Sequence, residues 1–168
     1  MQMHSNMRNT SLAEQPFHNS TGWVGHYPGR ESNIVRGQTF IPDREGDLTA
    51  IELFSEIVTD PGKVILSIHP VDPGRGNWGP ALDSSSVELD YNDTESWISF
   101  PMHGVHLERG QCYGFRIEAQ DALIGIGETV GIASRPPVVN GQEWKFINGL
   151  DADKFNYFSL AFRVEARA

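Results

Sequence analysis

Residues 113–120 alternate strictly between two kinds of side chain. The odd positions are apolar, Tyr113, Phe115, Ile117 and Ala119, whereas the even positions are small, polar or charged. A period of two places successive side chains on opposite faces of an extended strand. One face of this segment is therefore expected to pack on a core while the other carries polar groups, as in an antiparallel strand that is covered on one side.

Similar strand patterns recur along the chain, and no segment keeps a helical period. The clearest further segments are residues 32–41, 48–58, 64–69 and 158–164. The 17 Gly and 10 Pro place turn signals between them. These patterns predict an all-β fold, an antiparallel β-sandwich of the jelly-roll type with about nine or ten short strands. The sandwich is expected to span residues 32–168.

Residues 1–31 are expected to form an N-terminal arm outside the sandwich. This segment is rich in Asn, Ser, His and Gly, and it shows neither the helical nor the strand period. Trp23 and Tyr27 interrupt its polarity. They could pin the arm onto the sandwich or onto a second copy of the chain, or they could form part of a ligand-binding platform.

The charge balance restricts the kinds of partner. With 13 basic and 22 acidic residues, the formal net charge is −9, which repels phosphate backbones and anionic lipid. Nucleic acid and membrane surfaces are therefore disfavoured, and no apolar run is long enough to cross a bilayer. The polar N-terminus does not read as a secretory signal, and the single Cys112 excludes an intrachain disulfide. A neutral ligand or a cation meets no such repulsion.

The order of the segments resembles a known group of proteins. The resemblance rests on Gln38-Thr39-Phe40, on Trp97-Ile98-Ser99-Phe100, on the turn from Val105 to Tyr113, and on the closing Leu160-Ala161-Phe162-Arg163-Val164. Over residues 32–166 the chain resembles non-catalytic jelly-roll modules of bacterial extracellular proteins, of the galactose-binding-like or carbohydrate-binding-module-like kind. This resemblance implies a carbohydrate-binding module at an extracellular or cell-surface location.

The loop of residues 70–80 is the main candidate for a ligand site. Its three prolines and three glycines exclude helix and sheet interior. It places Trp78 beside Asp72, Arg75 and Asn77. An exposed indole can stack on a sugar ring while planar polar groups bind the hydroxyls. The alternative is that Trp78 folds back over the sheet edge as a lid.

An acidic turn is the candidate for a cation site. Asp90, Asp93 and Glu95 lie within six residues, and oxygen ligands of this kind suit calcium. The spacing of an EF-hand is missing, so an ordinary solvated turn is the competing interpretation.

Three hypotheses about function follow. The first is a non-catalytic module that binds carbohydrate or another neutral surface ligand. The second is a structural subunit that assembles through its aromatic arm, giving a homo-oligomer. The third is a carbohydrate-active enzyme, for which strand carboxylates such as Glu118 and Glu128 are available. The sequence contains no nucleophile-elbow motif, so serine-type catalysis is not indicated.

Overall fold

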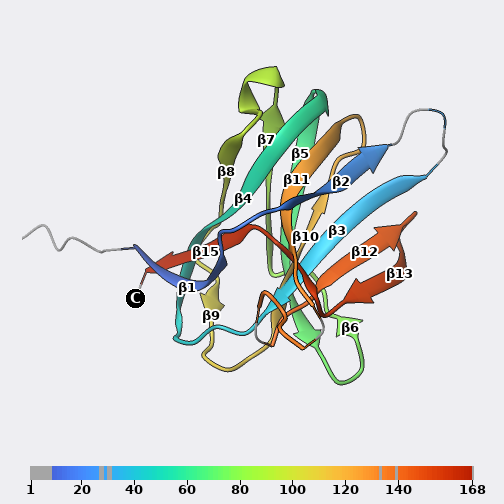
Figure 1. Cartoon of the computed structure of the whole chain (residues 1–168). Helices are drawn as coiled ribbons and strands as arrows, with labels where there is room; N and C mark the ends of the chain where they lie inside the picture. Colours follow the sequence, from blue (N-terminus) through green and yellow to red (C-terminus); the bar gives the residue numbers. More distant parts are fainter. Residues whose placement is uncertain (1–8, 27–28, 30–31, 133, 139, 168) are drawn as a thin grey trace, which may run out of the picture.

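The computed structural model describes residues 9–26, 29, 32–132, 134–138 and 140–167, and its ordered elements are almost all strands (Figure 1). The strands in chain order are β1 (Asn9–Gln15), β2 (Ser20–His26), β3 (Asn33–Phe40), β4 (Gly46–Asp60), β5 (Gly62–Asp72), β6 (Asn77–Trp78), β7 (Asp83–Leu89), β8 (Ser96–Pro101), β9 (His106–Leu107), β10 (Tyr113–Glu118), β11 (Leu123–Val130), β12 (Glu143–Ile147), β13 (Leu150–Phe155), β14 (Phe158–Leu160) and β15 (Phe162–Arg167). A single 3-10 turn, η1 (Tyr91–Asp93), precedes β8. Among the described residues, no helix has the length and apolar composition needed to cross a membrane.

All of the strand pairs are antiparallel, and the main path through the sheet runs β1-β15-β4-β11-β2-β3-β10-β5-β6. β8 and β9 add to β4, β7 adds to β5, and the β12–β13 hairpin adds to β3. The long strand β4 changes partners along its length. Its first part pairs with β15 and β8, and its last part pairs with β11. β4 therefore passes from one layer of the sandwich toward the other.

The core shows that the sheet folds onto itself. β10 and β15 are far apart in the strand order, yet the rings of Phe115 and Phe162 lie 5.6 Å apart. Phe40 contacts both rings, with centroid distances of 6.3 and 6.1 Å. All three side chains are completely buried. Such interlocked aromatic rings contribute more than their buried area alone.

The predicted fold class is confirmed. Tyr113, Phe115 and Ile117 are buried, as the alternation predicts, and so are Leu160 and Phe162 of the closing segment. Phe158 belongs to a separate strand, β14, and is half-buried. Among the described residues the strands number fifteen rather than nine or ten, because residues 9–26 form β1 and β2 and because residues 70–80 and 143–160 contain short strands without a readable alternation.

The N-terminal segment differs from the expected arm. Its described residues form β1 and β2, and β2 lies inside the sheet between β11 and β3. The buried side of β2 carries Gly22 beside Val24. A glycine contributes no apolar side chain to the pattern, so the alternation is hidden. Trp23 is therefore a strand residue, whereas Tyr27 lies outside the described residues.

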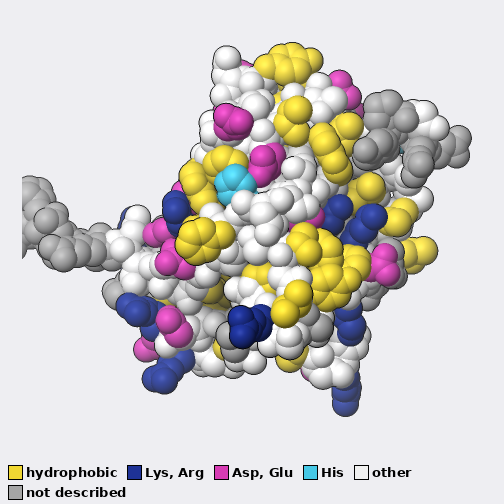
Figure 2. All heavy atoms as spheres, in the orientation of Figure 1, with side chains coloured by type: hydrophobic (Ala, Val, Ile, Leu, Met, Phe, Trp, Pro, Cys, Tyr) yellow, Lys and Arg dark blue, Asp and Glu magenta, His cyan; other side chains and the backbone are white. Residues whose placement is uncertain are grey.

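Charged side chains of both signs are intermixed over the face shown in Figure 2. Apolar side chains interrupt them, most broadly near the region where β3 and β12 run in Figure 1. Among the described residues of this face, the basic side chains form no continuous stripe of the kind that follows a nucleic-acid backbone.

Candidate functional site

The strand register assembles a row of side chains on the outer face of the sheet. Trp144 of β12 pairs with Gly37 of β3, Gly37 pairs with Arg116 of β10, and Arg116 pairs with Ser67 of β5. Directly paired residues of an antiparallel ladder point to the same side. Since neighbouring Phe115 points into the core, this row faces outward.

Two glycines in this region make room for an indole. An ideal Cβ at Gly114 would lie 2.4 Å from Cη2 of Trp78, and one at Gly37 would lie 3.1 Å from the same atom. The Cη2 and Cζ3 edge of Trp78 therefore lies directly against the backbone of β10, with Cη2 also close to β3. β6 brings it there by pairing with β5, with Trp78 opposite Val71. Glycine inside a strand commonly marks such a close approach.

Around Trp78 the rings form a compact cluster. Trp144 and Phe146 both meet Trp78 edge to face at 5.7 Å, and their own rings are nearly parallel at 6.1 Å. The Arg116 guanidinium lies 4.6 Å from the Trp78 ring centroid and 4.2 Å from that of Phe146. We refer to Trp78, Trp144, Phe146 and Arg116 as the aromatic face. The ring quadrupoles attract the cation and so help to fix the Arg116 side chain.

A small cavity lies beside the aromatic face. Its volume is about 220 Å³, and we refer to it as the Arg116 pocket. It is lined by Val35, Ser67, His69, Arg116, Glu118, Phe146 and Gly149. Side chains from β3, β5, β10 and β12 thus converge on one concavity, with a guanidinium, a carboxylate, an imidazole, a hydroxyl and an aromatic ring.

Hydrogen bonds determine the state of His69. Its Nδ1 lies 2.9 Å from the Gly79 carbonyl oxygen, which can only accept, so Nδ1 carries the proton. Its Nε2 lies 2.8 Å from Oγ of Ser67. Burial lowers the pKa of His69, the Arg116 charge lowers it further, and the bond to Gly79 opposes both. At neutral pH the ring is therefore neutral, with Nε2 as the acceptor of the Ser67 hydroxyl.

The predicted loop residues are divided between two sides of a hairpin. Trp78 is half-buried against the sheet, whereas Asp72 and Asn77 are paired neighbours on the other side. Asp72 accepts the backbone N–H groups of Gly74 and Arg75, which orders the loop. The exposed Arg75 guanidinium approaches Asp72 at 4.0 Å. The loop therefore borders the aromatic face, but only Trp78 belongs to that face.

Trp23 lies in a different place from Trp78. Thr21, Trp23 and Ile57 surround Gly125 of β11, so Trp23 covers another glycine of the sheet. Its indole is half-buried. The structure does not gather Trp23 with the Trp78 loop.

The acidic turn forms a helix cap. Asp90 accepts the N–H of Asn92 at 2.7 Å, and Asp93 accepts the N–H of Asp90 at 2.8 Å, which is a capping box around η1. Glu95 adopts a left-handed backbone with φ of 55°. Within the described part of the chain, no three His, Cys, Asp or Glu side chains gather in a way that could hold a metal ion.

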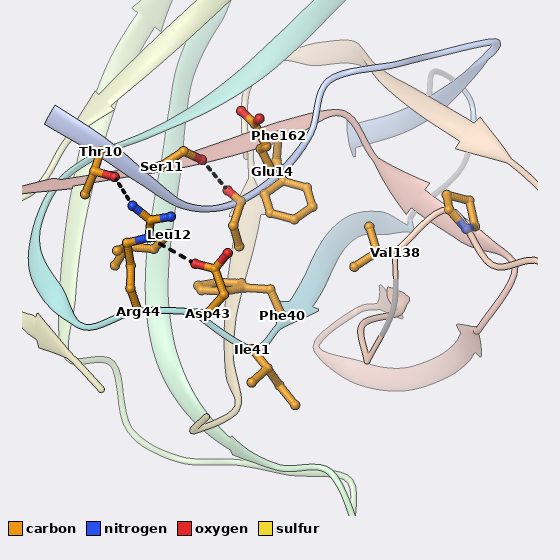
Figure 3. Close-up of a pocket in the computed structure, with 12 residues that line it drawn as sticks. Thr10, Ser11, Leu12, Glu14, Phe40, Ile41, Asp43, Arg44, Val138 and Phe162 are labelled. Atoms are coloured by element: carbon orange, nitrogen blue, oxygen red, sulfur yellow. Dashed lines mark hydrogen bonds and ion pairs between the residues drawn. The ribbon is translucent and has the colours of Figure 1, made fainter. Parts of the chain in front are cut away.

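A second cavity, of about 530 Å³, lies at the β1 edge (Figure 3). Arg44 at its rim donates to Thr10 at 3.1 Å and to Asp43 at 3.4 Å. The rings of Phe40 and Phe162 line it but are completely buried, so they offer no open surface for stacking. The described rim is polar, with exposed Asp43 and Arg44.

A pair of carboxyl groups lies inside the sheet near β2. Glu143 is completely buried, and the Arg36 guanidinium contacts Glu143 at 3.1 Å and Glu128 at 3.8 Å. Burial, strengthened by the neighbouring Glu128 and opposed by Arg36, raises the pKa of Glu143 to about 9. Glu143 therefore holds a proton at neutral pH. Neither carboxylate lines the cavities of about 220 and 530 Å³.

Sequence reasoning misses the residues that form the pocket. Glu118 appears only as one of several strand carboxylates available to an enzyme, Arg116 only as part of the polar side of a strand, and His69 as a strand residue. The signal that could have found the face is Gly37 and Gly114, two glycines inside otherwise regular strands.

The fold is similar to solved structures of a bacterial surface protein. One is the structure of the cysteine protease and lectin-like domains of Cwp84, a surface layer associated protein of Clostridium difficile, with 12% identity and a TM-score of 0.53. Another is the clostridial cysteine protease Cwp84 after propeptide cleavage, with 10% identity and a TM-score of 0.57. The matches cover 80% and 95% of this chain but 32% and 40% of the matched chains. At such identities the likeness concerns the fold.

No protein-family model and no curated protein sequence matches the chain.

Proposed function

We propose that the protein is a binding module that takes a carbohydrate in the Arg116 pocket, next to the aromatic face. The observation that carries the proposal is the convergence of Ser67, His69, Arg116 and Glu118 beside the ring of Phe146. A sugar presents hydroxyl groups around an apolar C–H surface. Charged and hydroxyl side chains can donate to and accept from the hydroxyls, while the buried Phe146 ring forms an apolar part of the pocket wall.

Charge and fold similarity support the same proposal. A net charge of −9 imposes no repulsion on a neutral sugar. One of the two similar structures includes the lectin-like domain of a surface layer associated protein. By this analogy, we place the module at the cell surface or outside the cell, where surface polysaccharides are available as ligands.

A glycan array with the purified chain tests the proposal, and calorimetric titration then measures each hit. Glu118→Ala removes a half-buried carboxylate from the pocket, and we expect binding to weaken roughly tenfold or more, as for a lost hydrogen bond to a charged group. Glu88→Ala is the matched control, because Glu88 is an exposed carboxylate on β7. Unchanged binding by Glu118→Ala, or no glycan bound by the wild-type chain, would refute the proposed site.

Assembly is the second candidate function, and exposed apolar side chains favour it. Phe17, in the connection between β1 and β2, is 75% exposed, and Ile132 is 59% exposed. Single exposed apolar residues are common, but several near one end of the sheet can support contacts between copies. Light scattering decides this point: a monomer at all concentrations excludes assembly, whereas a stable oligomer that binds no glycan favours it over the first candidate.

A further inference from the structure

We propose that Ser67 and His69 form a nucleophile and general-base pair that hydrolyses small acyl esters in the Arg116 pocket. The two residues are two positions apart on β5, so their side chains share the outer face. Ser67 Oγ lies 2.8 Å from Nε2 of His69, within the reach expected of a nucleophile and its base. This activity goes beyond sugar binding and does not depend on it.

The third member of the arrangement is the Gly79 carbonyl. Because it accepts from Nδ1 of His69 at 2.9 Å, it fixes both the ring orientation and the tautomer. The unprotonated Nε2 then faces the Ser67 hydroxyl. In serine hydrolases a carboxylate commonly performs this orienting role, and here a backbone oxygen occupies the equivalent position. The partly buried ring stays neutral, which is the form a general base requires.

The pocket also supplies a group that can stabilise negative charge. Arg116 is the direct cross-strand partner of Ser67 and lines the same cavity. Its guanidinium is held between Trp78 and Phe146, at 4.6 and 4.2 Å from the two ring centroids. A fixed cation beside the nucleophile can stabilise the oxyanion of a tetrahedral intermediate. A cavity of about 220 Å³ favours a short acyl group over a long one.

The reaction balances without any additional reactant except water. The Ser67 oxygen bonds to the ester carbonyl carbon, the carbonyl π electrons move to its oxygen, and the Ser67 proton passes to Nε2 of His69. When the carbonyl re-forms, the bond to the alkoxy oxygen breaks and His69 returns the proton to that oxygen, so an alcohol leaves. Water then attacks the acyl-serine by the same steps. The net change is ester plus water to carboxylic acid plus alcohol.

The experiment uses two probes, a fluorophosphonate and 4-nitrophenyl acetate. We expect the fluorophosphonate to label the wild-type chain, with tandem mass spectrometry placing the adduct on Ser67. Hydrolysis of 4-nitrophenyl acetate should fall at least tenfold in Ser67→Ala and in His69→Gln, as for the loss of a nucleophile or a general base. Ser84→Ala is the control and should keep the wild-type rate, because exposed Ser84 is the β7 neighbour of Ser67 and has no histidine partner in the described structure.

Two outcomes would overturn the inference. One is folded wild-type protein, verified by circular dichroism, that carries no adduct on Ser67 after prolonged exposure to excess probe. The other is a folded Ser67→Ala variant that hydrolyses the ester at the wild-type rate. The site of labelling on the wild-type chain decides the matter even where a variant fails to fold. Neither result affects glycan binding, which Glu118→Ala tests separately.

Discussion

Replacing Gly114 by Ala should displace Trp78 from the sheet. The new methyl group would lie 2.4 Å from Cη2 and 2.6 Å from Cζ3 of the indole, far inside van der Waals contact. The indole cannot simply turn away, because Trp144 and Phe146 meet it at 5.7 Å on other sides. Overpacking of this kind costs about 1–3 kcal/mol in the free energy of unfolding.

A double-mutant cycle isolates the contact between the two residues. Trp78→Ala alone should cost about 2–4 kcal/mol, somewhat less than a fully buried Trp→Ala change, because the indole is half-buried. In that background the nearest remaining atom to the methyl group added at position 114 is Val71 Cγ2, at 3.0 Å, the end of a side chain that can shift slightly. Alanine is also favoured over glycine inside a strand by roughly 0.5–1 kcal/mol. Gly114→Ala should therefore be neutral or slightly stabilising when Trp78 is already absent.

Urea unfolding followed by circular dichroism measures all four proteins of the cycle, and it avoids the fluorescence change caused by removing a tryptophan. Gly74→Ala is the matched control, since a Cβ there meets only Asp72 Oδ1 at 3.4 Å, an ordinary contact. We expect a coupling energy of at least about 1 kcal/mol between positions 78 and 114. Additive costs in the double mutant, or a Gly114→Ala protein as stable as the wild type, would show that Trp78 does not lie on the strand backbone.

Two further predictions concern the interior. The pKa of Glu143 is raised from its ordinary value of 4.5 to about 9. Between these pH values the folded state keeps a proton on Glu143 that the unfolded state has released. The contribution of Glu143 to the free energy of unfolding therefore falls as pH rises from about 4.5 to 9. The Glu143→Gln variant should therefore melt at a higher temperature than the wild type at pH 8, and this difference in melting temperature should be smaller at pH 5. An equal difference at the two pH values would contradict the buried proton. Phe115→Ala should lower the free energy of unfolding by about 3–5 kcal/mol, measured by urea unfolding, because a completely buried ring leaves a cavity between the layers. A loss below about 1 kcal/mol would show that position 115 is not in the core.

The strands that can be predicted from the sequence are those in which apolar and polar side chains alternate strictly. Phe115 and Phe162 lie in segments where every second residue is apolar, and both are buried as expected. β2 escapes detection because Gly22 occupies a buried position without an apolar side chain. The short strand β6 escapes because it contains two residues, too few for any period. A local sequence pattern reveals a strand only where several consecutive side chains alternate between apolar residues on the buried face and polar residues on the exposed face.

The candidate site cannot be assembled from sequence for a different reason. Ser67 and His69 are close along the chain, but Arg116 becomes their neighbour only through the pairing of β5 with β10. Trp144 joins them through β3. Register between distant strands depends on turn geometry and on which faces are buried, and neither can be read from one segment alone. Trp78 is identifiable because it stands in a conspicuous loop, although its side chain points to the sheet.

The pairing of β1 with β15 has a consequence for biosynthesis. Asn9 lies opposite Arg167, and Gln15 lies opposite Phe162, so the first described strand has its partner near the last described residue. During translation β1 and β2 leave the ribosome long before β11 and β15 exist to pair with them. Folds dominated by such distant pairings form slowly, in milliseconds to seconds, and their unpaired strands are prone to aggregate meanwhile. The sheet can close only after β15 has been synthesised, so β1 stays without its strand partner for most of translation.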